Sequence, residues 1–372
     1  MREIDEVRTP GLLLDLDRFE ANTADLVAIA QAHGIEYAPH AKTHRIPELG
    51  RRQLAAGAAR LTVAKLGEAE AFAEAGVTAI LVAVPIVGTA RARRALELHR
   101  RTDLRLTIDS AVGAADLGAV FAAAGERARV LIAVDTGLGR EGVAPAEAPG
   151  LAALVAATPG LELLGVLTHE GHAYAAIDAA DLVDRAAAAA RRLVATAVAI
   201  RAAGIPCAVV SLGCSASVAA VATVPGVTEL RPGIASFGDV GLLALGVLPH
   251  DRMAVRVVAT VVSAPEPGRA CIDAGSKALG ADLILASAHR DEFGGYGLLE
   301  GAPGWVLERL SEEHGWLRPS GVDAPGELVP GQRVTVIPNH VCMAFAALRR
   351  ATAIRGDAVV GVWEGLGPGA SE

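Results

Sequence analysis

A lysine with unusual neighbours is the first residue of this chain that could do chemistry. Only three of the 34 basic residues are lysines, and one of them, Lys42, lies between two histidines in the segment Pro39 to His44. A primary amine forms a Schiff base once burial or neighbouring cations lower its pKa, whereas a guanidinium stays protonated. The segment therefore indicates a Schiff-base lysine, although a surface lysine in a loop between histidines would give the same pattern.

Small residues that could hold an anion occur in two loops later in the chain. They are Gly213 and Ser215 in the first loop, and Gly233 and Ile234 in the second. Backbone N–H groups in such loops converge on phosphate, especially at the start of a short helix. Ordinary tight turns are the alternative interpretation. A Schiff-base lysine combined with a pair of phosphate-binding loops points to pyridoxal 5'-phosphate as the cofactor.

Two possible metal ligands, His340 and Cys342, lie close together near the C-terminus. If this segment is a strand, both side chains share one face, because residues two apart in a strand point the same way. Imidazole and thiolate favour Zn2+, with Mn2+ and Mg2+ as further candidates, and two protein ligands leave positions open for water and substrate. A buried cysteine beside an incidental histidine is the alternative.

A glycine-rich loop, Gly137 to Gly142, matches the GxGxxG pattern of dinucleotide-binding sites and contains Arg140. A dinucleotide site needs a helix that opens directly after the loop, and Pro145 and Pro149 disrupt such a helix. We therefore interpret the loop as one that presents Arg140 to a site, with an ordinary glycine-rich turn as the alternative.

Short apolar runs that are typical of strands alternate with alanine-rich stretches that are typical of helices. Eight such units are what a (β/α)8 barrel needs, although a doubly wound sheet would show the same alternation. We predict an α/β fold with an N-terminal TIM-type barrel over residues 20–240. The eight runs are Ile35 to Ala38, Leu61 to Ala64, Ala79 to Val84, Leu104 to Ile108, Val130 to Val134, Leu161 to Leu167, Cys207 to Ser211 and Val227 to Leu230.

The barrel prediction also says where the chemistry lies, because active sites of this fold gather at the C-terminal ends of the strands. Lys42 follows the first run and Arg140 the fifth. His169 and His172 follow the sixth, and the two phosphate loops follow the seventh and eighth. We predict that these groups form one site, in which Lys42 and His172 are catalytic, and in which His172 or a metal-held water acts as the base.

The sequence pattern changes after residue 240, where strand-like runs are separated by turns that contain glycine, proline and acidic residues. We predict a second, mostly β domain that is formed by residues 1–19 and 241–372, includes the early strand Leu12 to Leu14 and carries the metal site. Its other predicted strands are Val255 to Val262, Ala270 to Asp273, Arg333 to Ile337 and Ala358 to Val362.

Composition excludes several classes of protein. The net charge is -8 and the arginines are scattered, so no basic stripe indicates nucleic acid and no polybasic run indicates a membrane surface. Charged residues between Met1 and Glu6 oppose a signal peptide, and the apolar runs are too interrupted to span a membrane. Four cysteines without CxxC spacing do not form a disulfide framework. We expect a cytoplasmic protein with a small-molecule substrate.

Six segments spread over nearly the whole chain carry a family resemblance. They are Thr9 to Asp15, Pro39 to His44, Asp135 to Arg140, Asp273 to Leu279, Glu313 to Gly315 and Pro338 to Cys342. Together they resemble the D-threonine aldolase and D-serine dehydratase family, which belongs to the alanine-racemase-like, fold type III group of pyridoxal-phosphate enzymes. The resemblance implies the barrel, the β domain, pyridoxal phosphate on Lys42, a divalent metal on His340 and Cys342, and a homodimer.

Two positions depart from the family pattern. His169 stands where the family usually has a tyrosine, and the segment Arg231 to Ala235 is more similar to alanine racemase. That similarity implies that Arg231 faces the pyridine nitrogen of the cofactor, with support from His169. Because arginine stays protonated, the ring nitrogen would remain largely unprotonated and the cofactor would be a weaker electron sink.

Three functions remain open. The first is a lyase that uses pyridoxal phosphate and a divalent metal on β-hydroxy-D-amino acids, either by retro-aldol cleavage, which we favour, or by dehydration through β-elimination. The second is a metal-independent amino-acid racemase, whose second base would be a tyrosine; Tyr296 is the one thin candidate. The third is a non-catalytic protein that carries pyridoxal phosphate, but it would need neither a metal pair nor a long C-terminal domain.

Overall fold

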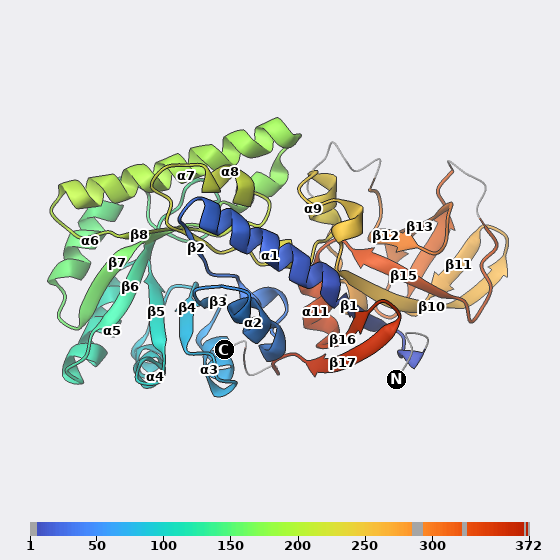
Figure 1. Cartoon of the computed structure of the whole chain (residues 1–372), viewed down its shortest axis with the longest axis horizontal. Helices are drawn as coiled ribbons and strands as arrows, with labels where there is room; N and C mark the ends of the chain where they lie inside the picture. The colour runs from blue at the N-terminus through green and yellow to red at the C-terminus, as the bar shows by residue number, and fades with distance from the viewer. Residues whose placement is uncertain (1–5, 285–292, 322–325, 368–369, 371–372) are drawn as a thin grey trace.

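Two lobes make up the molecule, a barrel formed by most of the N-terminal half and a β-rich lobe formed by the C-terminal part (Figure 1). The computed structural model describes residues 6–284, 293–321, 326–367 and 370. The charged N-terminal segment considered above lies almost entirely outside these ranges.

Eight parallel strands form the barrel within the described residues, in the order β2-β9-β8-β7-β6-β5-β4-β3. A parallel bridge between His40 and Thr62 joins the two ends of this order, so the sheet curls into a closed ring. The barrel prediction is confirmed. Its strands are β2 (Glu36–Tyr37), β3 (Leu61–Val63), β4 (Ala79–Val82), β5 (Asp103–Ile108), β6 (Ala128–Ala133), β7 (Leu161–Leu167), β8 (Val209–Leu212) and β9 (Glu229–Leu230).

Alanine-rich helices cover the outside of the barrel (Figure 1). The longest, α7, begins where the Asp178 carboxylate accepts a hydrogen bond from the amide of Asp181 at 2.8 Å. Small alanine side chains on its buried face let it pack closely on the strands. The helices of this lobe are α1 (Leu16–Ala32), α2 (Pro47–Ala55), α3 (Leu66–Glu74), α4 (Thr89–His99), α5 (Ala111–Ala123), α6 (Ala148–Ala157), α7 (Ala179–Ala202) and α8 (Val218–Ala222).

The second lobe contains a nine-stranded sheet, counted over the parts of the chain that the structure describes. The early strand β1 (Gly11–Asp15) belongs to it, pairing antiparallel with β10 and parallel with β16, although the exact boundaries of the two domains stay a prediction. The other strands are β10 (Val255–Glu266), β11 (Arg269–Ile272), β12 (Gly297–Glu300), β13 (Trp305–Leu310), β14 (Gly315–Pro319), β15 (Arg333–Pro338), β16 (Arg350–Arg355) and β17 (Ala358–Glu364).

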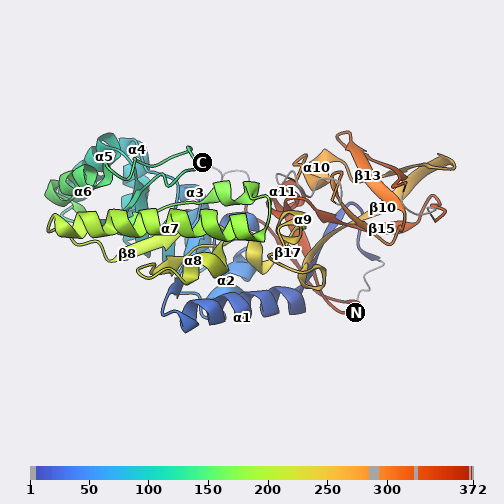
Figure 2. The ribbon, with the colours of Figure 1, turned by 90° about the horizontal axis from the view of Figure 1, so that it is seen from above.

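Further short helical segments occur in both lobes, and the helices α9 and α11 lie near the junction of the lobes when the molecule is seen from above (Figure 2). These segments are the helices α9 (Val240–Ala244), α10 (Ser276–Leu279) and α11 (Val341–Leu348), and the 3-10 turns η2 (Ala41–Thr43), η3 (Gly171–Ala175), η4 (Ile234–Ser236) and η5 (His250–Arg252). The turn η2 at the barrel mouth packs against α11 of the second lobe.

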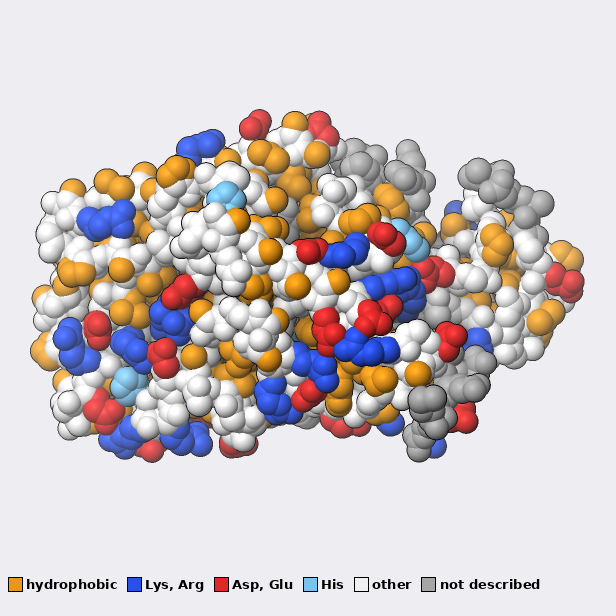
Figure 3. All heavy atoms as spheres, viewed as in Figure 1, with side chains coloured by type: hydrophobic (Ala, Val, Ile, Leu, Met, Phe, Trp, Pro, Cys, Tyr) orange, Lys and Arg blue, Asp and Glu red, His pale blue; other side chains and the backbone are white. Residues whose placement is uncertain are grey.

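Surface features agree with the composition. On the face in Figure 3, acidic and basic side chains are interspersed and neither sign forms a broad patch. Among the described residues, no helix combines the length and the apolar character that crossing a membrane requires.

A buried aromatic cluster ties the barrel to the second lobe. His44, which directly follows η2, is 2% exposed and packs against Phe237 and Phe345 with ring centroids 5.5 and 6.5 Å away. Burial lowers the pKa of His44 to about 4, because a charged imidazole is poorly solvated there. The imidazole is therefore neutral at pH 7, and protonating it at lower pH costs folding free energy.

We expect acid to weaken the fold through His44. Its pKa is lower in the folded state than in the unfolded state, so the stabilisation is complete above pH 6.5 and is lost as the pH falls toward 4. Between pH 7 and pH 5 the loss from this one group is on the order of 2 kcal/mol. His44→Gln should reduce the loss of unfolding free energy between pH 7 and pH 5 by about 2 kcal/mol, as measured by urea denaturation. The exposed control His33→Gln should leave this loss unchanged.

Candidate active site

A cavity of about 340 Å3 opens at the C-terminal ends of the barrel strands, where the second lobe meets the barrel. It brings together nine of the eleven residues that the sequence predicted for the site. They are Lys42, Arg140, His169, Gly213, Ser215, Gly233, Ile234, His340 and Cys342. The other two, His172 and Arg231, do not line it.

Lys42 lies at the centre of η2, at the mouth of the barrel. The turn begins at His40, whose imidazole Nδ1 accepts a hydrogen bond from the amide of Lys42 at 3.4 Å. Burial lowers the pKa of Lys42 below its ordinary value, and the positive charges of Arg140 and Arg231 lower it further. The nearby Cys342 acts in the opposite direction. The net shift favours the neutral amine that a Schiff base requires.

Two histidines near this lysine are held neutral. Burial lowers the pKa of His169 to about 3, and the charges of Lys42, Arg140 and Arg231 add to the effect. The pKa of His40 is also well below its usual value, mainly because the ring is buried and next because Lys42 is close. Neither ring therefore adds a positive charge beside Lys42 at pH 7.

Backbone amides converge on one hydroxyl at the end of β9. The N–H groups of Gly233, Ile234 and Ala235 donate to Ser215 Oγ at 3.0, 2.9 and 3.2 Å. A Cβ on Gly233 would stand 2.5 Å from Thr43 Oγ1, so only glycine fits this close approach. Three converging N–H groups and a hydroxyl at the start of η4 suit the phosphate of pyridoxal phosphate.

The Gly213 loop works differently from the sequence interpretation. The amides of Gly213 and Cys214 donate to the buried carboxylate of Glu170 at 3.2 and 3.1 Å, so they already have an anionic partner. A Cβ on Gly213 would meet Arg231 Nη1 at 2.9 Å. Glycine is therefore needed here for packing against the guanidinium.

Arg231 lies beneath the cavity and is held rigidly. It is 3% exposed and donates from Nε to Ser211 Oγ at 2.6 Å and from Nη2 to the carbonyl of Thr168 at 2.5 Å. Ser211 in turn donates to Glu229 at 2.6 Å. The imidazole Nδ1 of His169 hydrogen bonds to the carbonyl of Gly213 at 3.0 Å.

The loop that carries Arg140 closes on an aspartate. Asp135 Oδ1 accepts hydrogen bonds from the amides of Gly137, Leu138 and Gly139 at 2.8 to 3.1 Å. These amides are therefore not available to a pyrophosphate, which agrees with our interpretation that the loop is not a dinucleotide site. The half-exposed Arg140 pairs with Glu141 while it lines the cavity.

The turn η3 contains a site residue that the sequence reasoning missed. Tyr174 lines the cavity, and its hydroxyl hydrogen bonds with Ser215, which assigns it to the phosphate-binding side. Our interpretation had considered Tyr296 alone. His172 from the same turn instead faces Gly137, and a Cβ added to this glycine would lie 3.4 Å from the His172 ring. The placement gives no support to His172 as the base.

The metal pair occupies a helix start, so our interpretation of the segment as a strand was wrong. His340 is the N-cap of α11, in an extended conformation, and Cys342 lies in the first turn. The two side chains still meet, and His340 forms a hydrogen bond with Cys342. This bond, with support from Asp282, raises the pKa of His340 to about 9. Cys342 also donates to Thr43 Oγ1 at 3.4 Å.

This donor set fits a divalent metal ion. The second ring nitrogen of a metal-binding histidine usually has a carboxylate partner, and His340 Nδ1 lies 2.6 Å from Asp282 Oδ2. A metal ion would replace the proton that the imidazole and thiol share. Among the described residues no cluster of three or more His, Cys, Asp or Glu side chains forms.

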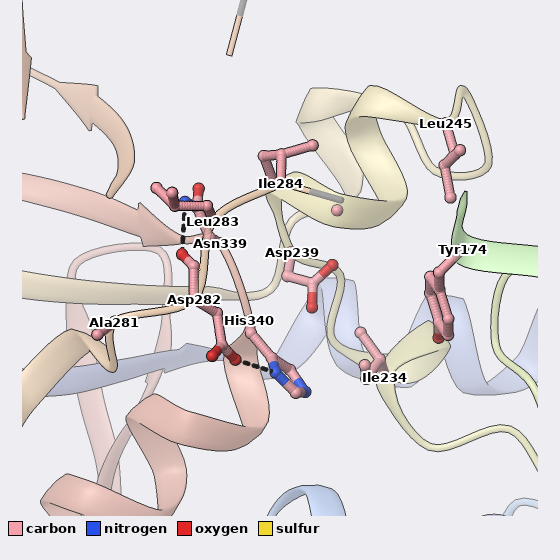
Figure 4. A pocket seen from close by; sticks show the side chains of 11 residues that line it. Tyr174, Ile234, Asp239, Leu245, Ala281, Asp282, Leu283, Ile284, Asn339 and His340 are labelled. Carbon is pink, nitrogen blue, oxygen red and sulfur yellow. Dashed lines mark hydrogen bonds and ion pairs between the residues drawn. The ribbon is translucent and has the colours of Figure 1, made fainter. Parts of the chain in front are cut away.

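A second cavity of about 510 Å3 adjoins the first, with Tyr174, Ile234 and His340 lining both (Figure 4). Its wall also contains the buried Asp239, whose carboxylate accepts hydrogen bonds from the amides at Leu242 and Val341, at 3.0 and 3.3 Å. Burial raises the pKa of Asp239 to about 6. His340 therefore stands at the junction of the two cavities, and Cys342 lines the first.

Comparisons with known proteins agree with this architecture. The family model for the alanine racemase N-terminal domain matches residues 14–240, and a model for a putative serine dehydratase domain matches residues 254–354. D-threo-3-hydroxyaspartate dehydratase of Delftia sp. (strain HT23) is 36% identical to this chain, and the aligned region covers 96% of this chain and 97% of the Delftia enzyme. D-threonine aldolase of Arthrobacter sp. is 31% identical, covering 96% and 92%.

The solved structure of the Delftia dehydratase superposes with a TM-score of 0.91 at 34% identity, covering 98% of this chain and 99% of that one. A (β/α)8 barrel with a half-buried lysine at its mouth and a β-rich second lobe, together with these relatives, defines a fold type III pyridoxal-phosphate enzyme. The chain belongs to the alanine-racemase-like family of D-threonine aldolases and D-serine dehydratases, and it is a pyridoxal-phosphate-dependent lyase.

We expect Lys42 to carry the cofactor. Lys42→Ala should abolish the visible absorption band of bound pyridoxal phosphate, because no other described amine lines the cavity. Lys277→Ala, an exposed lysine paired with Glu312 and Glu313, should keep the band. Borohydride reduction followed by peptide mapping should label Lys42, and a label on Lys65 or Lys277 would contradict the assignment.

Proposed function

We propose that the chain cleaves β-hydroxy-D-amino acids by a retro-aldol reaction, with pyridoxal phosphate on Lys42 and a divalent metal ion on His340 and Cys342. One observation carries the proposal. The amine-bearing turn and the metal pair meet at one cavity, since Thr43, the neighbour of Lys42, accepts the hydrogen bond of the Cys342 thiol at 3.4 Å. A cofactor site and a metal site this close can act on adjacent carbon atoms of one substrate.

Each group of residues has a separate task. Pyridoxal phosphate supplies an electron sink at the α-carbon, and a divalent metal ion lowers the pKa of a hydroxyl group. Lys42 would hold the cofactor, and Ser215 with the amides of Gly233 to Ala235 would hold its phosphate. Arg140 adds positive charge on the same side, where the α-carboxylate of an amino acid would lie.

Zn2+ is the metal that the ligands favour, because imidazole and thiolate both bind it well. Mn2+ and Mg2+ remain the other candidates. A cysteine-to-alanine mutant of the Delftia dehydratase has a solved structure described as the metal-free form, which supports a metal site in this family. Asp282 would orient His340 by bonding its Nδ1, which leaves Nε2 for the metal ion.

The charge of the second cavity favours retro-aldol cleavage. Cleavage requires that the β-hydroxyl group lose its proton, whereas dehydration requires that the α-carbon lose its proton and that the hydroxide leaving the β-carbon be stabilised. Asp239 and Asp282 line the cavity beside His340, and ionised carboxylates accept protons. Dehydration is the second candidate, favoured by the similarity to the Delftia enzyme.

The racemase and carrier functions receive less support from the structure. Tyr174 bonds with Ser215 at the phosphate cradle, so it offers little support for a racemase with a tyrosine base. The metal-binding donor set argues against a non-catalytic carrier. A homodimer and a cytoplasmic location stay predictions.

Metal removal should stop the reaction without releasing the cofactor. His340→Ala and Cys342→Ala should lose the bound metal and at least about 100-fold in kcat/KM, and Asp282→Asn should weaken metal binding by roughly 10- to 100-fold. All three variants should keep the visible absorption band, as should the exposed control His33→Ala. Metal content and turnover are measured together. Full turnover in a verified metal-free preparation would show that the pair is not catalytic.

The products from D-threonine identify which bond breaks. We expect glycine and acetaldehyde, quantified by chromatography and a coupled alcohol dehydrogenase assay, and no reaction with L-threonine, because a fixed site presents one Cα configuration. A 2-oxo acid and ammonia formed faster than glycine would assign the chain to the dehydratases instead.

A further inference from the structure

The donors and acceptors of the second cavity say which β-substituents it can hold. The cavity adjoins the metal pair, so a substrate whose β-hydroxyl lies at His340 would extend its β-substituent into this space (Figure 4). Its volume of about 510 Å3 exceeds what a methyl group fills and lies within the range of roughly 300 to 1,000 Å3 that is typical of small-molecule pockets.

Apolar side chains make up much of the wall. Leu245 and Ile284 are buried, while Leu283 is half-exposed at the rim. Ala281 and Ile234 also line the cavity, at opposite sides of the view in Figure 4. An alkyl or aryl group gains from leaving water for such a wall, by about 25 cal/mol for each Å2 of apolar surface that it buries.

The charged groups on the wall have the wrong sign for an anionic substituent. Apart from the shared His340, they are two carboxylates, Asp239 and Asp282, and neither lysine nor arginine lines the part of this cavity that the structure describes. The cations Lys42 and Arg140 face the first cavity. A β-carboxylate would therefore approach like charges in a partly dehydrated space, which is unfavourable.

The neutral polar groups offer a carboxylate little more. Asn339 uses its amide nitrogen for the carbonyls of Asp282 and Gly295, at 3.0 and 2.8 Å, which leaves only an acceptor oxygen. The amides of Leu242 and Val341 already donate to Asp239. These donors are thus paired within the protein, and a carboxylate would have to displace their bonds.

We propose that the chain prefers β-hydroxy-D-amino acids whose β-substituent is uncharged, apolar and larger than methyl, such as an aryl or branched alkyl group, and that it discriminates against a β-carboxylate. This inference rests on the proposed function, because it assigns the β-substituent to the cavity beside the metal pair.

The test compares three substrates on the protein loaded with pyridoxal phosphate and Zn2+. They are D-phenylserine, D-threonine and D-3-hydroxyaspartate, each in both β-configurations, and consumption of substrate is followed so that cleavage and dehydration count alike. We expect kcat/KM for D-phenylserine to exceed that for D-3-hydroxyaspartate by at least about tenfold. Equal or faster consumption of D-3-hydroxyaspartate would overturn the inference and leave the proposed function standing. Consumption of none of the three would overturn both.

Two substitutions test whether the charge of this wall is the cause. Leu283→Arg and Asp239→Asn should each raise kcat/KM for D-3-hydroxyaspartate relative to D-phenylserine by about tenfold, since each makes the cavity less negative. Leu154→Arg on the outer helix α6 and Asp178→Asn at the N-cap of α7 are matched controls that should leave this ratio unchanged. A ratio that the two cavity variants also leave unchanged would contradict the inference, and retention of the visible absorption band shows that they fold.

Discussion

The contact between η2 and the start of α11 is the constraint on which the site depends. It places Lys42 of the barrel beside His340 and Cys342 of the second lobe, and the Cys342–Thr43 hydrogen bond of 3.4 Å spans the junction. The same contact buries Lys42, and burial is the largest cause of its lowered pKa. Neither lobe alone would give both a neutral amine and a neighbouring metal pair, so the reactivity of the lysine is a property of the interface. The aromatic contact between His44 and Phe345 packs the same junction.

The barrel was predictable because its strands are buried on both sides and so form continuous apolar runs. The second lobe was only partly predictable. Its strand β12 is half-buried throughout and β13 alternates imperfectly, so neither forms an apolar run. The strand β16 begins and ends with arginine. These strands exist because of their neighbours in the sheet, and that pairing is a tertiary effect which local sequence does not encode.

The predicted site residues were mostly brought together, and the exceptions share a cause. The sequence places Tyr174 and His172 two residues apart, but η3 is a 3-10 turn that directs one toward Ser215 and the other toward Gly137. No periodic pattern of apolar residues in the sequence predicts such a short turn. Cys342 was expected on a strand, and it meets His340 because an N-cap residue in the extended conformation and a first-turn side chain face the same edge. The pairing was predictable from the residue types, but the geometry was not.

The two sides of the site differ in the charges that they can bind. The barrel loops present backbone N–H groups at Gly233 to Ala235 and the positively charged Arg140, which suit the phosphate and carboxylate anions of cofactor and substrate. The side toward α9 and α11 presents imidazole, thiol and carboxylate groups, which suit a metal cation. An amino acid bound between them would have its α-carboxylate on the donor side and its β-substituent on the acceptor side. The orientation of the substrate would then follow from the order of charges across the lobe interface, before any contact specific to its side chain is made.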